Sequence, residues 1–127
     1  MIGWVLTALV SFTLVAVGLG ALVVPRIAAS QYGIVIDDPR ALALFRAMGV
    51  RDVVIAVLIA LLAVERAREA VAWGMFATAV VAVIDLAVVM GDRRTRSGTR
   101  GFDRCCSLHA AGAIGLIVTG IILGAGF

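Results

Sequence analysis

Four apolar stretches, each about 20 residues long, constrain this chain more than any other feature. They cover roughly residues 3–24, 41–64, 70–90 and 107–126. A helix of about 20 apolar residues is long enough to cross the roughly 30 Å hydrocarbon core of a bilayer. We therefore predict an all-α, integral membrane four-helix bundle that forms one domain over residues 1–127.

Composition excludes several classes of protein. With 63% hydrophobic and 15% charged residues, the chain has too little polar surface to cover the core of a water-soluble domain. The net charge is +3 and every basic residue is an arginine, which excludes a Schiff-base lysine. A nucleic-acid partner is not expected, because no soluble module carries a basic face.

The distribution of arginines between the loops predicts the orientation. The loops at 25–40 and 91–106 lie on one side of the membrane and the turn at 65–69 lies on the other. The first side carries seven arginines and the second carries two: Arg26, Arg40, Arg93, Arg94, Arg96, Arg100 and Arg104 against Arg66 and Arg68. The positive-inside rule places the seven in the cytoplasm. We expect an N-out/C-out protein of the cell (inner) membrane, with Cys105 and Cys106 reduced on the cytoplasmic side.

Charges interrupt the second apolar stretch. Arg46 lies roughly 7–8 Å from its start, and Arg51 and Asp52 lie roughly 15–16 Å from it, near the bilayer midplane. A charge at the centre of the bilayer costs about 2.5–3.5 kcal/mol, so these side chains need partners. At about 100° per residue they point in three directions, so they cannot line one helix face. Either neighbouring helices surround this helix, or some arginines reach back along it.

Two further polar residues lie at the same level as Arg46. Asp85 precedes the end of the third stretch by about five residues, and His109 opens the fourth. A plain ion pair between Arg46 and Asp85 is one interpretation. The other is a polar pocket that opens to the cytoplasm and has an apolar floor, because well inside the outer half only threonines are polar: Thr7, Thr78 and Thr119.

Local signals also predict helix ends and helix contacts. Asp38 before Pro39 suits the start of a helix, with an acidic N-cap and proline at N1. The turn at 65–69 is so short that the helices beside it should be antiparallel neighbours. Small residues at contact spacing are Ala16 with Gly20 and Gly120 with Gly124. They favour a compact bundle, with a homodimer through Gly120 and Gly124 as the alternative.

A family resemblance rests on the residues already singled out. They are Tyr32-Gly33-Ile34, the run Arg46-Ala47-Met48-Gly49-Val50-Arg51-Asp52, Asp85 and His109. With these motifs the chain resembles the domain-of-unknown-function family 4267, a group of small four-helix membrane proteins, over most of its length. More distantly it is similar to the DoxX-like four-helix proteins. The resemblance implies the fold and the choice of residues, and no particular activity.

The sequence leaves three functions in competition. The first is cofactor-free acid–base chemistry, of isomerase or cyclase type, on a small lipid-soluble molecule, or binding of that molecule. The second is a non-catalytic accessory or assembly subunit whose charges pair internally. The third is a small proton or solute transporter with its site at Arg51 and Asp52, which the apolar outer half disfavours.

The first function assigns roles to particular residues. Asp52 and Asp85 are the candidate general acid and base, and Arg46, Arg51, His109 and Tyr32 are the candidate ligand-binding residues. Tyr32 could equally anchor at the lipid headgroups, and His109 could serve only the helix start. The sequence has no nucleotide-binding loop or metal-ligand spacing, so we expect no cofactor, no metal, and membrane lipid as the surroundings.

Overall fold

The computed structural model describes the backbone of residues 1–31, 36–91 and 99–126, and the side chains of these residues except 89 and 99–105. This part of the chain contains five helices: α1 (Ile2–Val23), α2 (Pro25–Gln31), α3 (Pro39–Val64), α4 (Arg68–Gly91) and α5 (Thr99–Gly124). The predicted all-α bundle is confirmed. Helices α1, α3, α4 and α5 are each long and apolar enough to cross a membrane, which is the build of a multi-pass membrane protein.

The start of α3 agrees with its sequence signal, and two other boundaries differ. Asp38 caps α3 by accepting a hydrogen bond from the Arg40 backbone N–H at 3.1 Å, with Pro39 as the first helical residue. The predicted first loop contains the short helix α2, which begins at Pro25. Helix α5 begins at Thr99 rather than near residue 107. The expectation equated helix with apolar stretch, whereas arginine and serine can continue a helix beyond the membrane.

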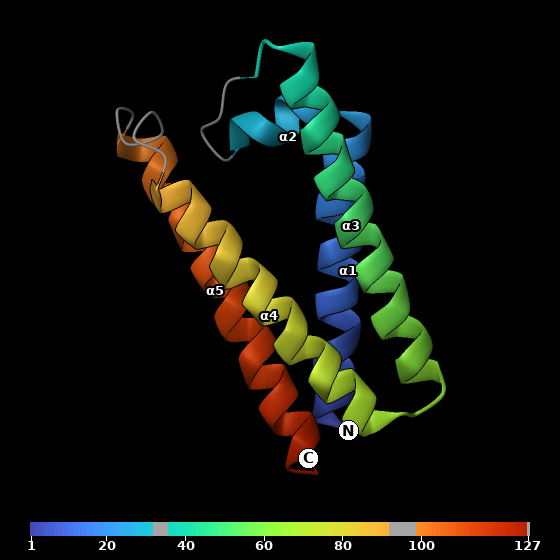
Figure 1. Cartoon of the computed structure of the whole chain (residues 1–127). Helices are drawn as coiled ribbons and strands as arrows, with labels where there is room; N and C mark the ends of the chain where they lie inside the picture. Colours follow the sequence, from blue (N-terminus) through green and yellow to red (C-terminus); the bar gives the residue numbers. More distant parts are fainter. Residues whose placement is uncertain (32–35, 92–98, 127) are drawn as a thin grey trace.

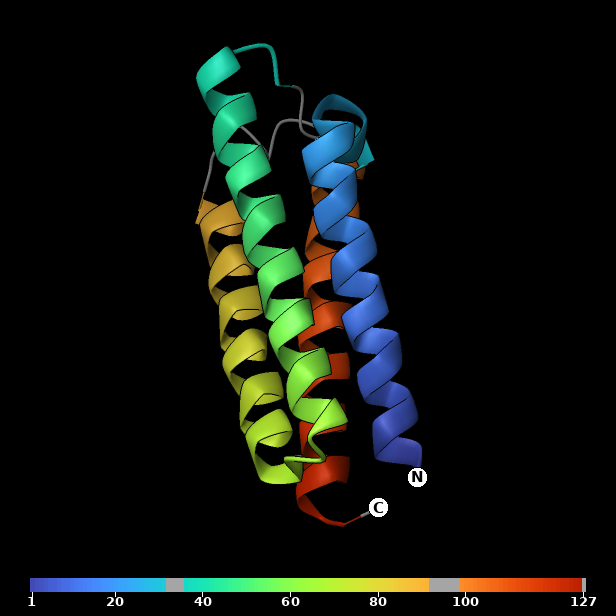
Figure 2. The same ribbon diagram turned by 90° about the vertical axis from the view of Figure 1, so that its right-hand side faces the viewer.

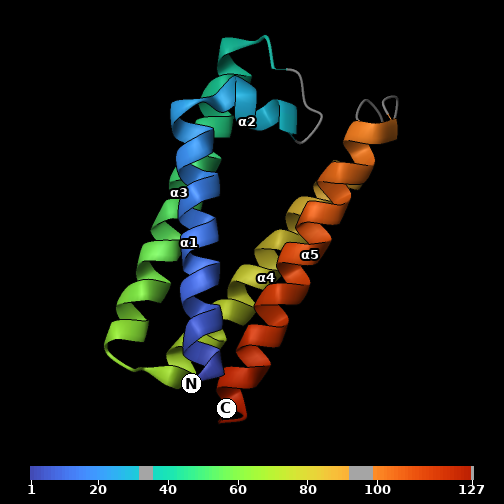
Figure 3. The same ribbon diagram turned by 180° about the vertical axis from the view of Figure 1, so that it is seen from behind.

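The four long helices form two antiparallel pairs. Helix α1 packs mainly on α3, and α4 mainly on α5, while α3 and α4 touch each other far less. The pairs converge where both termini and the turn at 65–67 lie, which we call the terminal end (Figure 1). They diverge toward α2, at what we call the open end, as the view from behind also shows (Figure 3). In the side view the axes of the four long helices are nearly aligned (Figure 2). The second and third long helices are antiparallel and in contact, as predicted, but each packs mainly on another helix.

Glycines determine where α1 and α3 meet. A Cβ built on Gly49 would lie 2.6 Å from the Gly18 carbonyl oxygen, and one built on Gly18 would lie 2.6 Å from the Gly49 carbonyl oxygen. Only glycine permits so close an approach of two backbones. The predicted contact at Gly20 is much looser, since its nearest neighbour is the Ala28 methyl group at 4.0 Å. Gly120 packs inside the chain against the ring of Phe76, so a homodimer, which stays a prediction, would need another surface.

The apolar core fills the terminal end. It contains Ile59 of α3, Val71, Ala72, Met75 and Ala79 of α4, and Leu116 and Leu123 of α5. At the same end, the Arg68 side chain donates a 2.5 Å hydrogen bond from Nε to the Leu123 carbonyl oxygen. That carbonyl belongs to the last turn of α5, where the helix itself provides no donor, and it also accepts from the Gly126 backbone N–H at 3.3 Å. Core packing holds the two pairs together at the terminal end and leaves the open end for a cavity, while the capping bond joins α4 to α5 within one pair.

Candidate functional site

A cavity of about 330 Å³ lies between the two helix pairs. Most of its lining is apolar and comes from all four long helices, including Leu14, Phe45, Met48, Val88, Leu108 and Leu116. Ala28 of α2 adds to the lining, and α2 contacts both α3 and α5. The splay of the pairs therefore produces a chamber with apolar walls, which is the usual character of a small-molecule site.

Three charged side chains form one network on the wall of this cavity. Arg51 of α3 donates from Nη2 to Asp85 Oδ2 at 2.8 Å and from Nη1 to Asp85 Oδ1 at 3.4 Å, across to α4. The same guanidinium donates from Nε to Oδ1 of Asp52 at 3.2 Å. One arginine thus holds two carboxylates, in a fork geometry that suits paired carboxylate oxygens.

The network is partly exposed within the chain. The exposed side-chain fractions are 36% for Arg51, 20% for Asp52 and 21% for Asp85. No charged residue among those that the structure describes is buried. Because all three side chains line the cavity, they remain accessible to a molecule inside it.

Arg46 does not pair with Asp85. Arg46 is exposed and does not line the cavity. The described ion-pair partner of Asp85 is Arg51. The sequence argument placed Asp85 level with Arg46 by counting residues from the membrane edge. The pairs diverge toward the open end, so Arg46 is carried away from α4, while the long Arg51 side chain spans the gap nearer the core.

The three charged residues of α3 do not line one face, as the helical wheel predicts, because Arg46 is exposed and lies off the cavity wall. Arg51 and Asp52 are neighbours in sequence and point about 100° apart, yet both line the cavity and bond to each other. The guanidinium is long enough to bend back over the adjacent residue, which a wheel of Cβ directions ignores. Arg46 does point elsewhere, as the wheel predicts.

His109 of α5 lies on the cavity wall and is half-buried. It is close enough to Asp52 for the two side chains to interact electrostatically. The structure therefore brings together four of the six predicted site residues: Arg51, Asp52, Asp85 and His109. Tyr32 lies outside the described residues, as does the side chain of Cys105, and Cys106 is a free thiol.

Sequence reasoning missed the apolar part of the site. Phe45 and Met48 lie on the cavity wall beside the charged residues. They precede Asp52 by seven and four positions, spacings at which side chains share a helix face. Thr78 also lines the cavity, with its hydroxyl bonded to the Gly74 carbonyl oxygen at 2.7 Å. Spacing from the charges could have found the first two residues, and no local signal marks the third.

A two-carboxylate network held by one arginine, in an apolar chamber between membrane-spanning helices, defines a small polytopic membrane protein with a candidate ligand site. The chain belongs to the family described as a domain of unknown function (DUF4267), whose model matches residues 11–123. The match contains every candidate site residue. No curated protein and no solved structure matches the chain, and the distant likeness to DoxX-like proteins stays a prediction.

Proposed function

We propose that the cavity between the helix pairs binds a small lipid-soluble molecule and carries out cofactor-free acid–base chemistry on it, of isomerase or cyclase type. The observation that carries the proposal is the contact of Arg51 with both Asp52 and Asp85 on the wall of an apolar cavity. To pair the charge of Arg51, one carboxylate would be enough. A second carboxylate on the same arginine supplies a group that can exchange a proton beside a fixed positive charge.

The geometry supports different roles for the two carboxylates. Asp85 receives two bonds from Arg51 and is the better held, so it positions the guanidinium. Arg51 reaches only Oδ1 of Asp52, so the second oxygen of Asp52 is not held by the guanidinium. Asp52 therefore takes a proton from one substrate atom as the general base, and its carboxyl group returns that proton to another atom of the product. Protons balance, and the reaction needs no oxidant.

The membrane and the orientation of the cavity are part of the same proposal. The protein would lie in the cell (inner) membrane, with the open end and the cavity toward the cytoplasm, as the arginine distribution predicts. An apolar substrate would enter from the bilayer between the diverging pairs. Arg46 and Tyr32 belong to the same predicted site, and Arg46 would act near the cavity entrance.

The test is to extract and identify the molecule that the detergent-purified protein retains, by native mass spectrometry and chromatography. Isomerisation or cyclisation leaves mass unchanged. The wild type should therefore retain product, and Asp52→Asn should retain a species of equal mass and different chromatographic retention. Asp37→Asn, which changes an exposed carboxylate outside the long helices, is the control and should match the wild type. One identical species in all three proteins would exclude turnover, and unliganded protein in all three would exclude the ligand site.

A second candidate, a non-catalytic accessory or assembly subunit, is favoured by one observation. The Arg51–Asp85 pair joins α3 to α4, which otherwise make few contacts, so the network could serve to hold the helix pairs. If so, exchanging the charges in Arg51→Asp with Asp85→Arg should restore the cellular phenotype lost in either single variant. A catalytic site would stay inactive in the double variant, because Asp52 would lose its arginine.

A further inference from the structure

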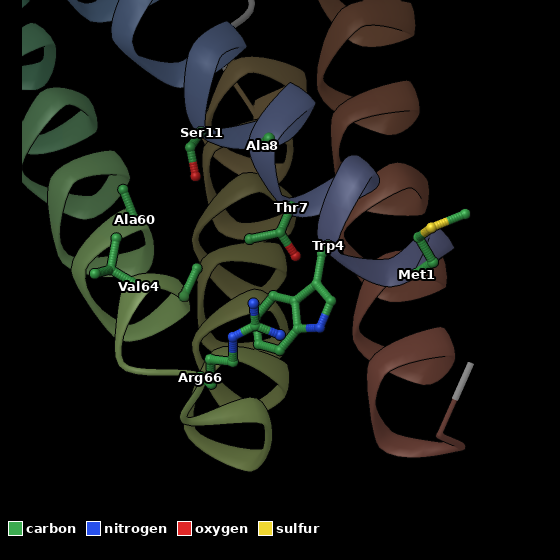
Figure 4. A pocket seen from close by; sticks show the side chains of 9 residues that line it. Met1, Trp4, Thr7, Ala8, Ser11, Ala60, Val64 and Arg66 are labelled. Carbon is green, nitrogen blue, oxygen red and sulfur yellow. The ribbon is translucent and has the colours of Figure 1, made fainter.

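A second pocket, of about 650 Å³, lies at the terminal end and shares no lining residue with the cavity. It is formed by the first turns of α1, the last turns of α3 and the residue Arg66 just after α3. From the close contact of Gly18 and Gly49 toward the terminal end, α1 and α3 separate, and the pocket occupies the space between them (Figure 4). Its walls are mostly apolar, so the few polar groups on them indicate what it holds.

The first such group is the hydroxyl of Ser11. Four threonines, Thr7, Thr13, Thr78 and Thr119, each donate to the carbonyl oxygen four residues earlier, at 2.7–2.8 Å. Ser11 is 8% exposed, and its Oγ has no hydrogen-bond partner in the described chain. Figure 4 shows this hydroxyl directed into the space between α1 and α3. A buried hydroxyl without a partner is costly, which points to an acceptor that the chain does not provide.

The second group is the guanidinium of Arg66. The Arg66 N–H bonds to the Ala63 carbonyl oxygen at 3.1 Å, and the Ala67 N–H to that of Leu62 at 3.0 Å. This is the Schellman ending of a helix, in which glycine usually occupies the left-handed position. Arg66 occupies it here with φ +54°. Arginine therefore stands where glycine would fit without strain, and its side chain lines the pocket, as Trp4 does.

The antiparallel register gives the depth of the two groups. With Gly18 opposite Gly49, Trp4 lies at the level of Ala63, and Ser11 lies about 15 Å deeper than the backbone of Arg66. The long arginine side chain covers part of that distance. The pocket therefore offers a cation at the end of the helices, a hydrogen-bond donor farther in, and apolar wall between them.

We propose that this pocket binds one anionic glycerophospholipid. Its phosphate would bond to Arg66, an ester carbonyl oxygen would accept from Ser11 Oγ, and an acyl chain would lie along α1 and α3. A fatty acid has only its carboxylate and leaves Ser11 without an acceptor, so the two separate polar groups favour the phospholipid. Arginine matches phosphate oxygens with its planar fork of donors. The pocket also becomes less polar with depth, as a bilayer leaflet does from its charged headgroups to its acyl chains.

Native mass spectrometry of the detergent-purified full chain, mixed with phosphatidylglycerol, phosphatidylcholine or oleate, tests this proposal. The wild type should retain one phosphatidylglycerol in preference to the other two. Arg66→Gly should weaken that binding about tenfold, as expected for one charge-assisted contact, and should fold at least as well because glycine suits the left-handed backbone. Arg66→Asn, which also tolerates that backbone, is a second uncharged variant.

Ser11→Ala tests whether the Ser11 hydroxyl contacts the lipid or only stabilises the fold. Because Ser11 Oγ has no partner in the described chain, the variant should keep the Tm of the lipid-free protein while retention of phosphatidylglycerol falls several-fold. Arg40→Gln and Ser30→Ala, exposed residues at the open end, are matched controls that should bind like the wild type. Equal retention by the wild type, Arg66→Gly and Ser11→Ala would overturn the proposal, and so would a preference for oleate.

Discussion

Arg51 on α3 donates hydrogen bonds to both carboxylate oxygens of Asp85 on α4, at 2.8 Å and 3.4 Å. This contact joins two helices that otherwise touch little, and it lies on the wall of the cavity between the helix pairs. It also fixes the guanidinium beside Asp52, so the same contact bears on stability and on chemistry.

Asp85→Asn should destabilise the protein. The substitution leaves Arg51 with Asp52 as its only charged partner in the network, and removing one member of a buried pair costs about 3–5 kcal/mol. Both side chains are partly exposed, so we expect a smaller loss, of about 1–3 kcal/mol. Thermal unfolding in detergent micelles measures it against Asp37→Asn, whose carboxylate lies outside the long helices. An unchanged Tm would show that the pair does not hold α3 to α4.

Gly49→Ala should separate α1 from α3. The added Cβ would lie 2.6 Å from the Gly18 carbonyl oxygen and 2.8 Å from the Ala21 methyl group, so the helices must shift at a cost of about 1–3 kcal/mol. Gly115→Ala is the matched control, because a Cβ there meets nothing within 4 Å. Unfolding in increasing SDS compares the two variants, and equal stability would contradict the close crossing.

Arg68→Gln should loosen the end of α5. The guanidinium caps the Leu123 carbonyl oxygen, and a hydrogen bond from a charged donor contributes about 1.5–3 kcal/mol. Faster hydrogen exchange in the last turns of α5, together with a lower Tm, is the expected result. Arg40→Gln removes an exposed arginine at the opposite end and should change neither quantity. If the two variants behave alike, the cap does not contribute to stability.

Cysteine labelling tests the orientation. Cys106 belongs to the start of the α5 membrane span at the open end, which the arginine distribution places in the cytoplasm. A membrane-impermeant maleimide should therefore leave Cys105 and Cys106 unlabelled in intact cells. Ala125→Cys, in a chain with both native cysteines replaced by serine, should be labelled from outside. The reverse pattern would invert the topology.

Counting residues along the chain predicted the local structure well. Four spans, the Asp38 cap and the set of charged residues follow from length, hydropathy and capping chemistry, which depend on near neighbours. The same counting failed for the pair of Arg46 and Asp85. Depth along a helix says nothing about how far apart two helices lie at that depth, and the side chain that reaches Asp85 starts about 7–8 Å farther along α3.

The sequence by itself determined that this chain is an apolar four-span helical protein with charges in its second and third spans, because hydropathy and helix length are local properties. Only the tertiary structure decided that Gly18 and Gly49 bring α1 and α3 together, that α4 packs with α5, and that a cavity opens between the pairs. Backbone approach and side-chain reach depend on how whole helices cross. For that reason Arg51, rather than Arg46, holds Asp85.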